Sequence, residues 1–354
     1  MIIRNNAADR GSNPHDYCKS VLPRVSRTFS ISIDVLRGDF YKSILCSYLL
    51  CRIIDTVEDS KFADFSQQKA LFNSFTDLFA RQDFSDSSVQ NWVDAFFAAA
   101  VLRPDEQDYY GLIKNTRLVV ANFLSLPRNY RDLIRECVIE MSTGMLGMVA
   151  KRENNGATPF FLTTEEDLEK YCYFVAGTVG ILTTKLLRED SSRVNNSLFN
   201  YLEERSVSFG LGLQMTNILK DCWTDYQRGL CYIPKEMISR YDLMADNFFV
   251  PENSPKAQKT IDDLIEKAAA HLDRGLDLIV SLPRTQFRVK LSCLWPLFFA
   301  IKTLIAIKNN SKLLSGEKTK ISRDEVKTLL RKTTLLGWNN KSVRKYYDSF
   351  RGQL

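Results

Sequence analysis

The sequence predicts an all-α protein. Glycine (15 residues) and proline (10 residues) are scarce in a chain of 354 residues, whereas β-sandwiches and β-barrels need many turn residues. Apolar residues recur every three or four positions through most of the chain, which is the period of an amphipathic helix. No convincing run of alternating polar and apolar residues predicts a strand.

The helical period predicts the elements in chain order. We expect helices over residues 39–58, 69–80, 91–102, 108–126, 130–150, 166–188, 197–227, 257–282, 286–313 and 323–336. Turn residues such as Pro104–Asp105 and Ser315–Gly316 separate them. No linker is polar or long enough to divide the chain. We therefore expect one domain over 1–354, with a loose N-terminus over 1–14 and a basic C-terminal tail over 337–354.

The composition indicates the cellular compartment of the protein. No apolar run reaches the roughly 18 to 20 residues that span a bilayer, and the N-terminus lacks the apolar stretch of a signal peptide. The eight cysteines form no CxxC pair, which favours free thiols in a reducing compartment over a zinc site. We expect a cytoplasmic monomer.

Basic residues are concentrated at the C-terminal end. Residues 301–354 hold 13 Lys and Arg but 4 Asp and Glu, whereas the net charge of the whole chain is +6. This excess suits an anionic partner, either a phosphorylated cofactor or an acidic membrane surface that the protein contacts peripherally. A solvated helix face with a loose tail is the alternative. Aromatic residues are not interleaved with the basic ones, so we expect no nucleic-acid partner.

A first acidic motif ends the helix predicted over 39–58. Asp55, Glu58 and Asp59 are three and four positions apart, so they project from one face of the helix. Like charges at this spacing repel by roughly a few tenths of a kcal/mol per exposed pair. Taken alone, such a motif is more often a solvated helix face.

A second polar stripe lies in the helix predicted over 197–227. Asn217, Asp221 and Asp225 recur every four residues, and Gln214 lies one turn earlier. Their apolar neighbours predict that this helix is buried, where unpaired carboxylates are prohibitive. Two such stripes that face each other can share Mg²⁺, which binds carboxylate and substrate phosphate oxygens. The sequence therefore predicts a magnesium and diphosphate site over an apolar cavity.

Several segments resemble the squalene/phytoene synthase family over about residues 15–335. They are Ser26–Phe29, Tyr48–Asp59 (YLLCRIIDTVED), Tyr171–Gly180 (YCYFVAGTVG) and Gln214–Asp225 (QMTNILKDCWTD), the last followed by Gln227–Gly229 and Tyr232–Pro234. The stretch after residue 285 is similar to the squalene synthase branch. There Lys320–Arg323 resembles a basic segment that contacts the nicotinamide cofactor, except that Ser322 stands at a position where a basic residue is expected. No membrane anchor follows Leu354, so we expect a bacterial-type enzyme.

The resemblance implies a single-domain isoprenoid-synthase helical bundle around a central cavity. It also implies a reaction. Two farnesyl diphosphates join head to head to form presqualene diphosphate, which NADPH (or NADH) converts to squalene by reductive rearrangement. Such chemistry needs Mg²⁺ and fixed charges around a leaving diphosphate rather than a protein nucleophile.

The residues expected to carry this chemistry fall into four groups. The expected metal ligands are Asp55, Glu58, Asp59, Asn217, Asp221 and Asp225, and the four aspartates form the catalytic set with Tyr48 and Tyr171. The expected diphosphate contacts are Ser26, Arg27, Thr28, Arg52, Gln214, Asn217 and Lys220. The expected cofactor contacts are Arg27, Arg52, Lys220, Lys320 and Arg323. The expected cavity wall is Phe29, Met145, Met148, Phe174, Val175, Gly177 and Leu182, and core packing explains each of these side chains equally well.

Four glycines within predicted helices have two interpretations. Gly177, Gly180, Gly210 and Gly212 make room for a prenyl chain, or they let two helices cross closely.

Other functions also remain open. Within the enzyme class, the product is presqualene diphosphate, dehydrosqualene or phytoene, without a reductive step. Outside it, the protein is a non-catalytic assembly factor of the same fold, or a peripheral membrane adaptor that uses its basic end.

Overall fold

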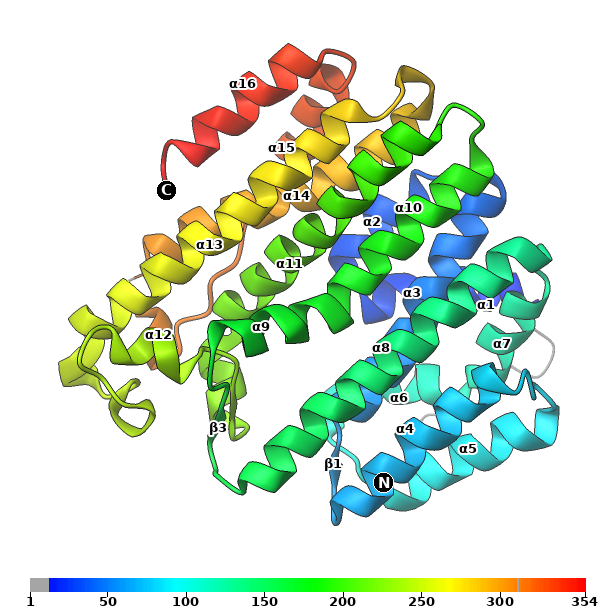
Figure 1. Ribbon diagram of the computed structural model, residues 1–354, viewed down its shortest axis with the longest axis horizontal. Coiled ribbons are helices and arrows are strands. Elements are labelled where there is room, and N and C mark those ends of the chain that lie inside the picture. The colour runs from blue at the N-terminus through cyan, green and yellow to red at the C-terminus, as the bar shows by residue number, and fades with distance from the viewer. Residues whose placement is uncertain (1–12, 311) are drawn as a thin grey trace. The chain divides into compact units, whose positions relative to one another are not determined.

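The computed structural model describes residues 13–310 and 312–354, without the side chain of Arg27. Nearly all of its elements are helices (Figure 1), so the predicted all-α class is confirmed. The α-helices are α1 (Pro14–Val25), α2 (Arg27–Asp34), α3 (Gly38–Asp59), α4 (Phe65–Ala80), α5 (Asp86–Ala99), α6 (Gln107–Lys114), α7 (Thr116–Leu124), α8 (Arg128–Asn155), α9 (Glu165–Cys172), α10 (Thr178–Asp190), α11 (Asn196–Gln227), α12 (Lys235–Ser239), α13 (Ser254–Ser281), α14 (Phe287–Lys308), α15 (Arg323–Leu336) and α16 (Asn340–Arg351). The two-residue strands are β1 (Lys61–Phe62), β2 (Ala100–Val101), β3 (Phe160–Phe161) and β4 (Leu230–Cys231).

The chain forms two compact units. The first comprises Met1–Glu153 and Lys185–Ser192, and the second comprises Asn154–Thr184 and Arg193–Leu354. In the first, α3 contacts α1, α4 and α7, and β1 pairs with β2 in antiparallel orientation. In the second, α11 runs along α13, which in turn packs on α14 (Figure 1). The expectation of one domain over the whole chain stays a prediction.

The structure corrects several predicted boundaries. The helix predicted over 108–126 is two helices, because Asn115 leaves the helical conformation and its Nδ2 donates to the Gly111 carbonyl at 2.9 Å. The helix predicted over 166–188 is α9 and α10 joined by a π-helical turn, Tyr173–Gly177. The sequence analysis did not predict α1, α2, α12 and α16. The helix α1 contains Pro23, α2 and α12 are short, and α16 is mostly polar.

The basic C-terminal segment is a packed helix rather than a tail. Opposite charges attach α16 to α13, since Arg344 pairs with Asp277 at 2.7 Å and Tyr347 Oη donates to Asp273 at 2.9 Å. Arg351 pairs with Asp273 at 3.1 Å. At the other end of the chain, Asn13 caps α1, and residues 1–12 of the expected loose N-terminus lie outside the described residues.

One helix is apolar enough to be compared with a membrane span. Among the described residues, Arg284–Lys308 passes a length and hydropathy test for crossing a bilayer, which the sequence analysis did not anticipate. However, 72% of its most apolar window is buried inside the protein. Because α14 packs against α11, α13 and α15, we assign it to the core of the second unit.

Glycines allow a close helix contact in the second unit. A Cβ added to Gly210 on α11 would lie 2.5 Å from the Ala176 carbonyl oxygen. A Cβ added to Gly180 on α10 would lie 2.4 Å from the Ser206 carbonyl oxygen. The contacting atoms are backbone, which cannot rotate away. Of the two interpretations of these glycines, close helix crossing therefore accounts for Gly180 and Gly210.

This contact predicts the effect of a methyl group. Gly210→Ala is expected to lower the free energy of unfolding by about 1 to 3 kcal/mol, because α11 has to move away from the π-helical turn. Gly147→Ala on α8 is the matched control, since nothing lies within 4 Å of its added Cβ. That variant should be stabilised by up to about 1 kcal/mol through helix propensity. Urea unfolding measures both, and equal stability of the two variants would contradict the close crossing.

Candidate functional site

The first acidic motif occupies the last two turns of α3. The Ser60 N–H bonds to the Thr56 carbonyl as the helix ends, and Arg103 Nη2 donates to the Asp59 carbonyl at 2.9 Å. The chain then continues directly into β1. The end of α3, and with it the motif, is thus held by a second segment of the first unit. The sequence analysis gave Arg103 no role, because it lies 44 positions away in an unrelated stretch.

The three acidic side chains of this motif differ in exposure. Glu58 is 6% exposed, Asp55 is half-buried and Asp59 is exposed. The Gln68 amide donates to the Glu58 carbonyl at 3.1 Å, which ties α4 to this turn. Asp55 and Asp59 are therefore more accessible to a ligand than Glu58.

Arg52 lies at the centre of a polar cluster in the first unit. It forms an ion pair with Asp55, and its Nη2 donates to Tyr48 Oη at 3.3 Å. Its guanidinium also lies 5.9 Å from the centre of the Tyr48 ring and 5.7 Å from that of Tyr109. Burial lowers the pKa of Arg52, but the charge of Asp55 and the contact with Tyr48 outweigh it, so the net pKa lies well above the usual range. The guanidinium is therefore a permanent cation beside the carboxylates.

The segment of Ser26, Arg27 and Thr28 begins α2. The Ser26 side chain accepts from the Phe29 N–H at 3.2 Å as the N-cap, and Thr28 is exposed in the first turn. The side chain of Arg27 lies outside the described residues. The Phe29 ring lies 5.6 Å from the Tyr48 ring, so this helix start is close to the Arg52 cluster.

The second polar stripe occupies the last three turns of α11. The neighbouring apolar residues Met215, Ile218, Leu219 and Cys222 are buried, as predicted. The stripe itself is accessible, because Asn217 is exposed and Gln214, Asp221 and Asp225 are half-buried. Lys220 Nζ pairs with Asp221 at 3.1 Å.

Asp225 has the most perturbed carboxyl group of the stripe. Burial raises its pKa, and the nearby charge of Asp221 raises it further, to about 7. Arg228 and Lys220 lower the pKa but do not compensate. The folded chain alone therefore disfavours the ionised form of Asp225, and a bound cation is the kind of partner that would favour it.

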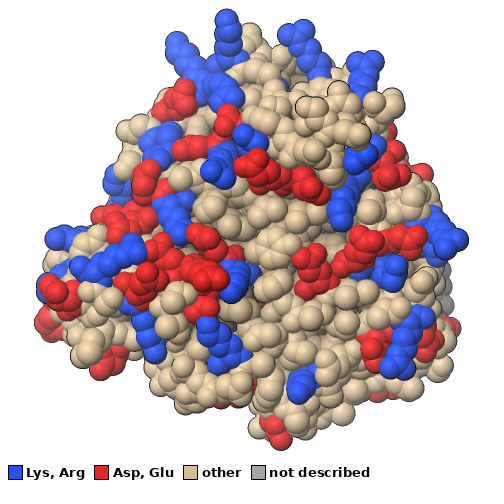
Figure 2. Space-filling view, viewed as in Figure 1, with Lys and Arg blue, Asp and Glu red and all other residues tan. Residues whose placement is uncertain are grey.

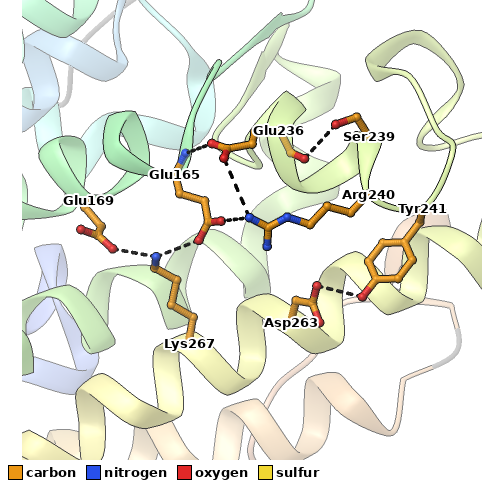
Figure 3. A network of polar contacts seen from close by, with 8 residues as sticks. All are labelled: Glu165, Glu169, Glu236, Ser239, Arg240, Tyr241, Asp263 and Lys267. Carbon is orange, nitrogen blue, oxygen red and sulfur yellow. Dashed lines mark hydrogen bonds and ion pairs between the residues drawn. The ribbon is translucent and has the colours of Figure 1, made fainter.

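A polar network fixes the start of α9 in the second unit (Figure 3). Glu165 forms ion pairs with Arg240 and with Lys267, the latter at 2.9 Å, and Lys267 also pairs with Glu169 at 2.6 Å. The hydrogen bond from Lys267, followed by that from Arg240, lowers the pKa of Glu165. Because Arg240 directly follows α12 and Lys267 lies on α13, the network holds three helices together.

Tyr171 lies at the other end of α9. It is 5% exposed and stacks on Tyr232, with ring centroids 4.2 Å apart. Tyr232 follows β4, which pairs with β3 in parallel register just beyond the end of α11. The tyrosine predicted to be catalytic thus contacts the chain that leaves the second stripe. The sequence analysis placed Tyr232 in a family motif without a role, since stacking is not visible from spacing.

The other predicted residues are placed as follows. Lys320 and Arg323 are exposed, before and at the start of α15. Ser322 is the N-cap of α15 in a capping box with Glu325, which accounts for a serine at this position. Of the expected cavity wall, Met145, Gly177 and Leu182 are buried, and Phe29, Met148, Phe174 and Val175 are half-buried. Their role as a cavity wall stays a prediction.

The structure brings the predicted residues together in two groups. Tyr48, Arg52 and Asp55 contact one another in the first unit, whereas Lys220, Asp221 and Asp225 are close in the second. The two stripes lie in different units, so the expectation that they face each other stays a prediction. Within residues 13–310 and 312–354, no three His, Cys, Asp or Glu side chains converge into a ready-made metal cage.

Comparison with known proteins supplies the family. The family model described as squalene/phytoene synthase matches residues 22–325. The squalene synthase of Homo sapiens is 28% identical over 318 residues, covering 90% of this chain and 69% of that protein. That of Bos taurus is 28% identical over 350 residues, covering 98% and 76%. The structure of TcSQS with a ligand has the same fold, with a TM-score of 0.80 at 20% identity, covering 97% of this chain and 91% of that one. The chain belongs to the squalene/phytoene synthase family.

Proposed function

We propose that this protein is a squalene synthase, a farnesyl-diphosphate farnesyltransferase. It condenses two farnesyl diphosphates to presqualene diphosphate and then reduces this intermediate to squalene. Family membership and relatives named squalene synthase over 90% and 98% of the chain support this choice. The observation that carries the proposal is the position of two carboxylate stripes, each at the C-terminal end of a long helix.

Carboxylates are unfavourable at that end of a helix. The helix dipole places partial negative charge there, and neither α3 nor α11 has a basic residue in its last turn. Burial, and then the charge of Asp221, further disfavour the ionised form of Asp225 and raise its pKa to about 7. Such a donor set, made of carboxylate and amide oxygens, fits Mg²⁺. In the proposal Asp55, Asp59, Asp221 and Asp225 are the principal ligands, with Glu58 and Asn217 beside them.

Bound Mg²⁺ would supply charge neutralisation for the departing diphosphate. The chain's own cations add to this. Arg52 is fixed by Asp55 and Tyr48, and so offers a preorganised guanidinium to phosphate oxygens. Ser26, Arg27 and Thr28 lie at the start of α2, where free backbone N–H groups favour anions such as a diphosphate. Lys220 and Gln214 have the same proposed role beside the second stripe.

In the proposal, two tyrosines and the apolar cavity wall guide the allylic cation that forms when diphosphate leaves. Ionisation of the first farnesyl diphosphate leaves a carbocation, which the 2,3-double bond of the second attacks, and loss of a proton closes the cyclopropane. The phenol groups of Tyr48 and Tyr171 guide the transfer of this proton, and their ring faces stabilise the cation. The proposed cavity wall, from Phe29 to Leu182, excludes water that would quench the cation.

The reductive step needs a nicotinamide cofactor, which supplies a hydride when bound. Lys320 and Arg323 are exposed cations at the start of α15, and they suit the cofactor's phosphates together with Arg27, Arg52 and Lys220. The proposal also includes a cytoplasmic monomer that contacts a membrane peripherally, because substrate and product are lipophilic.

Product analysis tests the reaction. Incubation with farnesyl diphosphate and Mg²⁺ should give presqualene diphosphate without NADPH and squalene with it, as identified by mass spectrometry. EDTA should abolish both products. Dehydrosqualene under both conditions would overturn the reductive step in favour of the alternative synthases. Absence of any turnover would favour the non-catalytic assembly factor.

Asp225→Asn is expected to separate catalysis from stability. It should abolish Mg²⁺-dependent turnover, as should Asp221→Ala. In EDTA it should raise the free energy of unfolding at pH 8 by about 1 to 2 kcal/mol, because it removes a carboxylate that the fold disfavours. This is less than the roughly 4 kcal/mol of the full pKa shift, since solvent partly screens a half-buried group. The folded pKa of about 7 lies above the unfolded value of 3.8, so this group costs stability as the pH rises from about 4 to 7. The gain of the variant should therefore grow over that range and be absent below it.

Urea unfolding between pH 4 and 8 measures this gain. Asp94→Asn is the matched control, since Asp94 is exposed and accepts a hydrogen bond from Gln90 that asparagine can also accept. It should show no such pH-dependent gain. If Asp225→Asn lowers stability at pH 8 relative to the wild type, the charge repulsion assigned to the stripe is wrong.

A further inference from the structure

Two large apolar side chains are exposed at one end of the second unit. Leu335 is 77% exposed and Trp338 is 63% exposed, although the second unit has a well-packed core. Leu335 lies in the last turn of α15, and Trp338 lies two residues beyond the end of this helix. Leu329 and Thr333 on the opposite face are buried. This pair is an exposed apolar patch rather than an isolated surface residue.

The tryptophan is rigidly presented. Its ring stacks on Phe287, at the start of α14, with centroids 3.7 Å apart and planes 12° apart. The loop after Trp338 is also fixed, because Asn340 Nδ2 donates to the Val280 carbonyl at 2.6 Å and Asn340 accepts from Lys290. One face of the indole is thus covered by Phe287, and the side chain as a whole remains exposed.

The chain around this patch carries positive charge alone. No Asp or Glu occurs in residues 278–316 or in residues 326–347, whereas these two segments hold twelve Lys and Arg. Among them Arg284, Arg331 and Lys341 are exposed. Arg284 lies three positions before Phe287, whose ring stacks on Trp338. Lys and Arg side chains project from the edge where the loop between α15 and α16 lies (Figures 1 and 2).

We propose that Leu335 and Trp338, with the rim of Arg284, Arg331 and Lys341, form a docking surface for an anionic lipid bilayer. Tryptophan and leucine insert at the boundary between headgroups and acyl chains, and the basic rim is attracted to anionic headgroups. The charge argues against a second copy of the chain as the occupant, because two such patches repel each other. The buried α14 beneath the patch does not insert.

This inference rests on the proposed peripheral membrane contact and not on the proposed reaction. Binding is measured without farnesyl diphosphate or NADPH, so a failure of the reaction does not affect the result. A failure of binding likewise leaves the product analysis intact.

Tryptophan fluorescence offers a direct test. Trp338 is the exposed one of the four tryptophans, since Trp92 and Trp295 are buried and Trp223 is half-buried. Large vesicles that mix phosphatidylcholine with anionic phosphatidylglycerol should shift the emission of the full chain to shorter wavelength. They should also protect it from acrylamide. Pure phosphatidylcholine vesicles and inorganic phosphate should cause neither effect.

Co-sedimentation with the same vesicles tests the individual residues. Leu335→Ser and Arg331→Glu should each reduce the bound fraction at low salt at least fivefold, and Trp338→Ala should do the same. The matched controls are Met244→Ser, at 64% exposure, and Lys69→Glu, which makes the same charge change on α4. Both controls should bind like the wild type, and 0.5 M NaCl should release the wild type.

Three results would overturn the proposal. Equal binding to neutral vesicles would remove the role of charge. Unchanged binding of Leu335→Ser and Arg331→Glu would place the contact elsewhere on the protein. A vesicle-free dimer in analytical ultracentrifugation that Leu335→Ser dissociates would identify a second copy as the occupant.

Discussion

Repulsion between carboxylates is the constraint on which the proposed site depends. Asp55, Glu58 and Asp59 end α3, and Asp221 and Asp225 end α11, where the helix dipole adds further negative charge. Burial, and after it the charge of Asp221, raises the pKa of Asp225, which is the clearest sign that ionised carboxylates are disfavoured here. In the proposed function, binding of divalent cations with a diphosphate restores the stability that these groups cost in the free state. The same electrostatic imbalance therefore underlies both the proposed metal binding and the expected gain in stability of Asp225→Asn.

Each stripe is held by similar means. A two-residue strand follows each helix end, β1 after α3 and β4 after α11, and each is paired with a distant segment. Arg103 bonds to the carbonyl of Asp59, and the Tyr171–Tyr232 stack joins α9 to the chain beyond α11. The ion pairs around Glu165 and Lys267 fix the other end of α9. These contacts keep the acidic groups in place although they repel one another.

Charge also divides the second unit into regions. Acidic residues on α13, such as Asp273 and Asp277, pair with α16. Beyond them, the two segments around Trp338, residues 278–316 and 326–347, contain Lys and Arg but no Asp or Glu. The first region stabilises the fold, whereas the second suits an external anionic surface. In the proposed function, substrate and product are lipophilic, so contact with a lipid bilayer would bring the protein to them.

The sequence by itself determined the helical class, most of the long helices and the membership of the acidic residues in two stripes. Periodicity and i, i+4 spacing are local properties, so they survive without knowledge of the fold. The sequence did not predict α16, whose mostly polar residues are held against α13 by ion pairs with Asp273 and Asp277. Nor did it assign roles to Arg103 and Tyr109, which contact residues of α3 in the first unit, or to Tyr232, which stacks on Tyr171 in the second. The exposed pairing of Leu335 with Trp338 was likewise decided by tertiary structure, since packing alone determines which face of a helix is left uncovered.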